Sequence, residues 1–67
     1  MSTIWVNGEE LQWKSNQSVG EVVSNLVAST RGVAVAVDRS VIPRSEWDST
    51  ILEAGAQVEI VSAAAGG

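Results

Sequence analysis

The stretch that decides the fold runs from residue 18 to residue 27 and reads Ser-Val-Gly-Glu-Val-Val-Ser-Asn-Leu-Val. Ser18 and Glu21 have the spacing of a capping box, in which each side chain accepts a hydrogen bond from a free backbone N–H at the start of a helix. We predict a helix from about Val19 to Ser29, closed by Arg31-Gly32. Its apolar residues form one stripe at helical spacing: Val19, Val22, Val23, Leu26 and Val27.

A β-hairpin is predicted before this helix. Thr3–Val6 is rich in β-forming residues, and Asn7-Gly8 is the strongest two-residue hairpin signal because both positions tolerate positive φ. Leu11–Lys14 alternates apolar and polar side chains, as a half-buried strand does. We expect this segment to be the return strand, with a loop that can extend through Glu9 and Glu10.

A second, shorter hairpin is predicted after the helix. Val33–Val37 alternates valine and alanine, Asp38-Arg39 makes the turn, and Ser40–Ile42 returns. Pro43 ends that strand because it has no N–H for the ladder. The last predicted strand is Val58–Ser62.

An irregular segment, Arg44–Thr50, separates the second hairpin from this last strand, with a short helical turn expected from Ser45. We expect Trp47 to pin it to the body and Arg44 to pair locally with Glu46 or Asp48. Trp13 is expected to close one edge of the core under the helix.

The order of elements predicts an α+β fold, a β-grasp arrangement with one helix packed on a small mixed β-sheet. The crossover before residue 58 is long enough to bring the last strand parallel to the first, in the middle of the sheet. A two-layer α+β domain with other strand pairing is the alternative.

Composition excludes several classes of function. The 67 residues make one small domain, with no cysteine and no histidine. The best nucleophile and the usual metal ligands are therefore missing, and we expect neither catalytic nor metal-binding residues. The net charge of −4 argues against a nucleic-acid partner.

We also expect no membrane segment. No apolar run approaches the roughly 20 residues of a membrane span, and the start of the chain lacks signal-peptide character. The expected location is cytoplasmic.

One face of the predicted sheet has no helix to cover it. Period-2 alternation turns Ile4, Val6, Val33, Val35 and Val37 toward the helix. An exposed apolar face commonly marks a protein interface, so we predict partner docking there. Alternatively, the indole on this face only shields the sheet. The residues turned to this face are Trp5, Ala34, Ala36 and Val61.

The sequence ends in Gly66-Gly67, preceded by three alanines. We predict a folded domain over 1–62 and a flexible tail over 63–67. Five extended residues reach about 17 Å, so such a tail could bring the Gly67 carboxylate into a narrow active site of another protein. An inert terminus is the alternative.

The chain resembles the ThiS group of sulfur carriers in thiazole and thiamine biosynthesis, which are ubiquitin-like β-grasp proteins. The resemblance covers nearly the whole chain. One departure is Asp38-Arg39, where members of the family often carry Asn-Gly. The residues that carry the resemblance are 6–9 (Val-Asn-Gly-Glu), 31–37 (Arg-Gly-Val-Ala-Val-Ala-Val), 42–47 (Ile-Pro-Arg-Ser-Glu-Trp), 55–61 (Gly-Ala-Gln-Val-Glu-Ile-Val) and Gly66-Gly67.

The resemblance implies a carrier rather than an enzyme. A ThiF-like, E1-like adenylating enzyme would use ATP and magnesium to adenylate the Gly67 carboxylate beside Gly66. A persulfide sulfur donor would then leave a thiocarboxylate, from which a ThiG-like thiazole synthase takes the sulfur. The carrier itself would bind no cofactor.

Three other functions stay open. The chain could carry sulfur for molybdopterin or cysteine synthesis, or it could be a ubiquitin-like modifier joined through Gly67 to a lysine of a target. It could also be a plain binding module.

Overall fold

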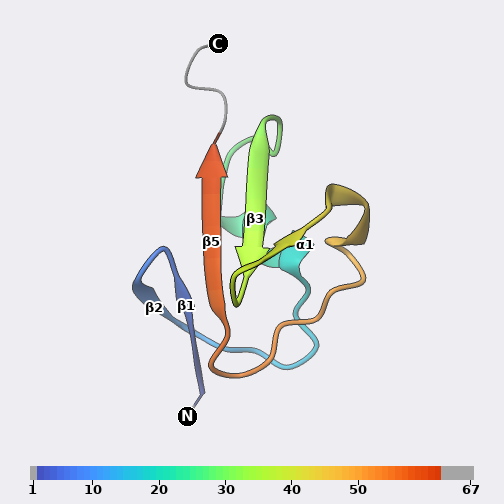
Figure 1. The fold of residues 1–67 in the computed structure, drawn as a ribbon. Coiled ribbons are helices and arrows are strands. Elements are labelled where there is room, and N and C mark those ends of the chain that lie inside the picture. Colours follow the sequence, from blue (N-terminus) through green and yellow to red (C-terminus); the bar gives the residue numbers. More distant parts are fainter. Residues whose placement is uncertain (1, 63–67) are drawn as a thin grey trace.

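The computed structural model describes residues 2–62, which form a five-stranded sheet with helix α1 behind it (Figure 1). The β-grasp arrangement predicted from the order of elements is therefore present. The elements in chain order are β1 (Thr3–Val6), β2 (Glu9–Gln12), α1 (Val19–Leu26), β3 (Val33–Val37), β4 (Ser40–Ile42), the 3₁₀ turn η1 (Arg44–Glu46) and β5 (Gln57–Ser62).

The last strand lies in the middle of the sheet, as predicted. The strand order is β2-β1-β5-β3-β4. β5 runs parallel to β1 and antiparallel to β3, while β2 and β4 form the edges as antiparallel partners of β1 and β3. The strand that leads toward the C-terminus is thus held by neighbours on both sides.

The first hairpin is tighter than predicted. Asn7 and Gly8 both have positive φ, 51° and 85°, and Val6 pairs directly with Glu9. A two-residue turn of this kind matches the twist of the two strands and needs no longer loop. The return strand is therefore Glu9–Gln12, and the prediction of Leu11–Lys14 with a loop through residues 9 and 10 is wrong.

The start of the helix is confirmed and its end is not. The hydroxyl of Ser18 accepts from the N–H of Glu21 at 3.1 Å, and the Glu21 carboxylate accepts from the Ser18 N–H at 3.4 Å. The helix ends at Leu26 because Val27 is extended, with φ −124° and ψ 144°. Val27 is the last residue of the apolar stripe and packs against the core in this extended conformation. The residues after it, Ala28-Ser29-Thr30, do not continue the stripe. Gly32 (φ 71°) lies in the turn before β3 rather than at a helix cap.

The core lies between α1 and the sheet face that carries the alternating apolar residues. Of the residues predicted to face the helix, Ile4, Val6 and Val35 are buried, and Val33 and Val37 pack against them half-buried. The other buried apolar residues are Val19, Val22, Val23, Trp47, Leu52, Ala56 and Val58.

The segment after β4 is fastened to this core by an indole. Trp47 is buried, and its Nε1–H donates to the carbonyl of Ile42 at 2.9 Å, which confirms its predicted role. The short helical turn begins at Arg44, one residue before the position predicted. In place of the expected local ion pair, Arg44 donates to Thr30 Oγ1 at 2.6 Å and lies over the Trp47 ring.

Trp13 is half-buried beside the core, as expected, and its Nε1–H donates to the carbonyl of Leu52 at 2.9 Å. None of the described residues forms a helix with the length and hydropathy needed to span a bilayer.

Truncating Leu52 tests the core. The side chain is 1% exposed, so Leu52→Ala should lower the free energy of unfolding by about 2–5 kcal/mol, measured by urea denaturation. Leu26→Ala is the matched control because Leu26 is 47% exposed. This variant should lose well under half as much free energy of unfolding. Equal losses would contradict the packing described.

Removing the helix cap gives a second test. Ser18→Ala should lower the free energy of unfolding by about 1 kcal/mol, because the N–H of Glu21 loses its acceptor. Ser24→Ala, at an exposed position in the same helix, should change stability little. Thermal melts followed by circular dichroism measure both, and a cap variant as stable as the wild type would refute the role of Ser18.

Candidate functional site

The sheet face opposite α1 carries all four residues predicted to form a docking surface. Trp5 is 41% exposed and Val61 is 59% exposed. Ala34 is exposed and Ala36 is half-buried. They share this open face because each alternates with a core-facing neighbour along its strand.

Strand register divides these residues into two groups. Ala34 pairs directly with Val61, whereas Trp5 pairs with Gln57 at the start of β5. Val61 lies four residue steps along β5 from Gln57, about 13 Å at the usual rise per residue. Trp5 therefore lies apart from the Ala34–Val61 pair on this face, and partner docking there stays a prediction.

The apolar group on β3 and β5 continues onto β4. Val41 pairs with Ala36 and is 75% exposed. We call the residues Ala34, Ala36, Val41 and Val61 the valine strip. Sequence reasoning missed Val41, although its place in the middle of a predicted strand, between Ser40 and Ile42, was a usable signal.

The valine strip lies beside the point where the chain leaves the sheet. Val61 directly precedes Ser62, the last residue of β5, and Ser62 pairs with Val33 at the start of β3. β5 projects beyond the end of β1 in Figure 1. The predicted reactive residues Gly66 and Gly67, and the tail that carries them, lie outside the described residues.

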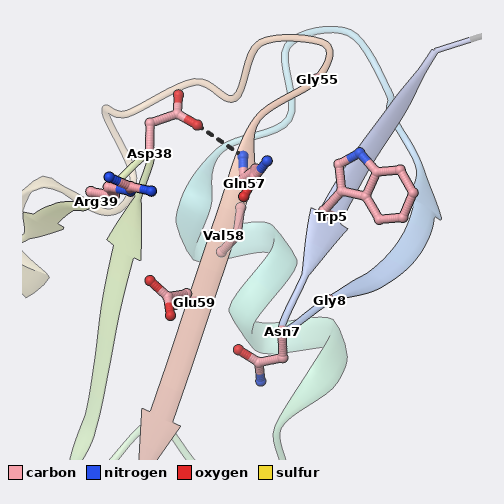
Figure 2. Close-up of a pocket in the computed structure, with 9 residues that line it drawn as sticks. All are labelled: Trp5, Asn7, Gly8, Asp38, Arg39, Gly55, Gln57, Val58 and Glu59. Carbon is pink, nitrogen blue, oxygen red and sulfur yellow. Dashed lines mark hydrogen bonds between the residues drawn. The ribbon is translucent and has the colours of Figure 1, made fainter.

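Trp5 forms one wall of an open hollow of ≈ 640 Å³ (Figure 2). The hollow lies where β1 pairs with β5 at Trp5 and Val6 and then enters the turn at Asn7 and Gly8. On the opposite wall, Asp38 Oδ1 accepts from the N–H of Gln57 at 3.0 Å. The lining residues are Trp5, Asn7, Gly8, Asp38, Arg39, Gly55, Gln57, Val58 and Glu59.

The chemistry of this hollow is that of a contact surface. It offers one indole ring, two side-chain amides and charges of both signs, but no thiol or imidazole. Within residues 2–62, no group of three or more acidic, histidine or cysteine side chains is placed to hold a metal ion.

Carboxylates lie between and beside the apolar groups of the open face. Glu59 pairs with Ala36 on β3, and Glu10 pairs with Trp5 on β2. With a net charge of −4 for the chain, this face is suited to a partner whose surface is apolar and basic.

Comparisons with known proteins agree with this geometry. The sequence model of the ThiS family matches residues 4–67. Sulfur carrier protein ThiS of Escherichia coli (strain K12) is 30% identical over 64 residues, covering 96% of this chain and 97% of that protein. The crystal structure of the thiamine biosynthesis protein ThiS from Geobacter metallireducens matches with a TM-score of 0.80 at 28% identity, covering 90% of this chain and 91% of that one.

The three matches each cover 90% or more of the chain, and the match to the family model includes the terminal glycines. The fold match confirms the β-grasp architecture independently of the order of elements. The chain therefore belongs to the ThiS family of small, ubiquitin-like sulfur carrier proteins, which are carriers and not enzymes.

Proposed function

We propose that this chain carries sulfur as a thiocarboxylate on Gly67 and donates it for thiazole formation in thiamine biosynthesis. The observation that carries this proposal is the family match through residue 67, in a chain with no cysteine to hold a persulfide. The relative from Geobacter is described as a thiamine biosynthesis protein, which supports the choice of pathway.

The chemistry needs a separate activating enzyme. A carboxylate is a poor electrophile, so a ThiF-like enzyme would use magnesium-bound ATP to form the acyl adenylate of Gly67 and release pyrophosphate. A persulfide would then attack the acyl carbon and expel AMP, and a second thiol would cleave the resulting acyl disulfide. The products are the thiocarboxylate and a disulfide on the donor, and a ThiG-like synthase would accept the sulfur.

In this proposal, the role of the chain is to present its C-terminal carboxylate to these enzymes. Gly66 and Gly67 have no Cβ, so the backbone of a partner can close around the reacting carbonyl. Residues 63–67 span about 17 Å when extended, which lets the globular body stay outside the active site. A partner that holds Gly67 must therefore meet the molecule near Ser62.

The open face is the proposed docking surface for these partners. The valine strip adjoins Ser62, and exposed apolar side chains on an uncovered sheet face favour protein contact. Trp5 lies farther from the tail and would contact a partner only where the interface extends along β5.

Intact-mass analysis tests the proposed chemistry. Incubation with a cognate adenylating enzyme, ATP, magnesium and a persulfide donor should replace one oxygen by sulfur on the C-terminal peptide. Removal of Gly67 should abolish the exchange without changing the thermal midpoint. Covalent adducts to other proteins would favour a modifier instead, and no change with a competent enzyme would refute both. Sulfur transfer to the precursor of another pathway, and not to a thiazole synthase, would reassign the pathway.

Charge substitutions on the open face test docking. Val61→Asp should weaken binding to the adenylating enzyme by roughly tenfold or more, because a carboxylate replaces an apolar contact. Trp5→Asp should also weaken binding, by less if the interface is centred on the valine strip. Ser24→Asp, on the exposed side of α1, is the control. Isothermal titration calorimetry measures the affinity of the three variants for the enzyme. Wild-type affinity in both Val61→Asp and Trp5→Asp would exclude this face as the docking surface.

A further inference from the structure

Asn7 connects the first hairpin to β5 through its side chain as well as its backbone. Its backbone N–H donates to the carbonyl of Val58 at 2.9 Å. Its Nδ2 donates to the carbonyl of Ile60 at 3.1 Å, and its Oδ1 accepts from the N–H of Ile60 at 2.9 Å. One turn residue thus makes three hydrogen bonds to a strand more than 50 positions away in the sequence.

The side chain takes the place of a missing strand residue. Along the β1 side of β5, the N–H of Trp5 bonds to Ala56 and that of Asn7 to Val58, so Ile60 is the next rung. The backbone has by then turned away at Gly8, with Asn7 itself at φ 51°. A side-chain amide places a carbonyl acceptor and an N–H donor in the planar arrangement of a peptide group, and the Asn7 side chain therefore completes the rung.

We infer that Asn7 is a positioning residue for the reaction at Gly67, an inference that rests on the proposed function. Ile60 lies two residues before the end of β5 and seven before Gly67. β3 holds the end of β5 on one side through the pairing of Val33 with Ser62, and the Asn7 rung restrains it on the other side. A partner that takes up the C-terminal residues then has less chain to order on binding.

The second hairpin supplies a matched control. Asp38 is also the first residue of a two-residue turn, with φ 49°. Its backbone N–H donates to the carbonyl of Gln57 at 2.8 Å, and its side chain accepts from the N–H of Gln57 at 3.0 Å. It fastens β5 in the same manner, but at the end of the strand far from Ser62.

The experiment compares Asn7→Gly with Asp38→Gly. Glycine keeps positive φ accessible in both turns and removes only the side-chain bonds. Steady-state kinetics with the adenylating enzyme, at a temperature where circular dichroism shows both variants folded, should give an about three- to tenfold higher KM for Asn7→Gly. Its kcat should stay near the wild-type value, because the bound enzyme holds the segment. Asp38→Gly also removes a charge from the wall of the hollow, so its KM is compared with that of Asn7→Gly and should rise less, although its stability falls as well.

Amide hydrogen exchange supplies a readout independent of the enzyme. The Ile60 N–H should exchange faster in Asn7→Gly than in Asp38→Gly, and the Gln57 N–H should show the reverse. Asn7→Asp is the second variant: it keeps the acceptor for the Ile60 N–H, loses the donor to the Ile60 carbonyl and should raise KM as well. If wild-type protein shows no reaction at Gly67, the proposed function fails, while exchange still decides whether Asn7 holds the end of β5. Unchanged Ile60 exchange in Asn7→Gly, or equal KM values for Asn7→Gly and Asp38→Gly, would overturn the inference.

Discussion

The packing of one apolar helix stripe on one face of the sheet is the constraint on which the rest of this structure depends. Val19, Val22 and Val23 are buried against Ile4 and the other core residues of the strands. A chain of 67 residues has a single helix of this kind within its described part, and one helix covers one face. The opposite face is left open as a direct consequence, and its apolar residues are available to a partner.

The same constraint explains why the molecule works as a carrier. A small domain with a single layer of core has little room for an enclosed pocket. The hollow beside Trp5 is open to solvent (Figure 2). With no histidine or cysteine, the side chains offer little chemistry at neutral pH. The family assignment agrees with the proposal that the fold presents a group on which other proteins act.

The position of β5 connects the fold with the proposed presentation of the C-terminus. β5 is central and lies between β1 and β3, so the strand that leads to the C-terminus is the one with neighbours on both sides. Both hairpins also contact it through their first turn residues, Asn7 near its end and Asp38 near its start. The turns of this sheet therefore do more than reverse the chain, because each also fastens the central strand.

The sequence by itself determined the elements and their order. The capping box at Ser18, the Asn7-Gly8 turn, the Val33–Val37 alternation and the terminal diglycine are local signals, and local signals set element type and chemistry. The end of the helix was predicted less accurately than its start. The helix ends at Leu26 and not near Ser29, because the length of a helix depends on which of its turns pack against the rest of the fold.

Only the tertiary structure decided how distant residues meet. Strand register places Trp5 beside Gln57 and away from Val61, and brings Val41 next to Ala36. It also sets the Asn7 amide against Ile60, a pairing that the sequence at Asn7-Gly8 presents only as a turn. The physical reason is that alternation fixes which face a residue occupies, whereas its neighbours on that face depend on the pairing of strands far apart in the chain.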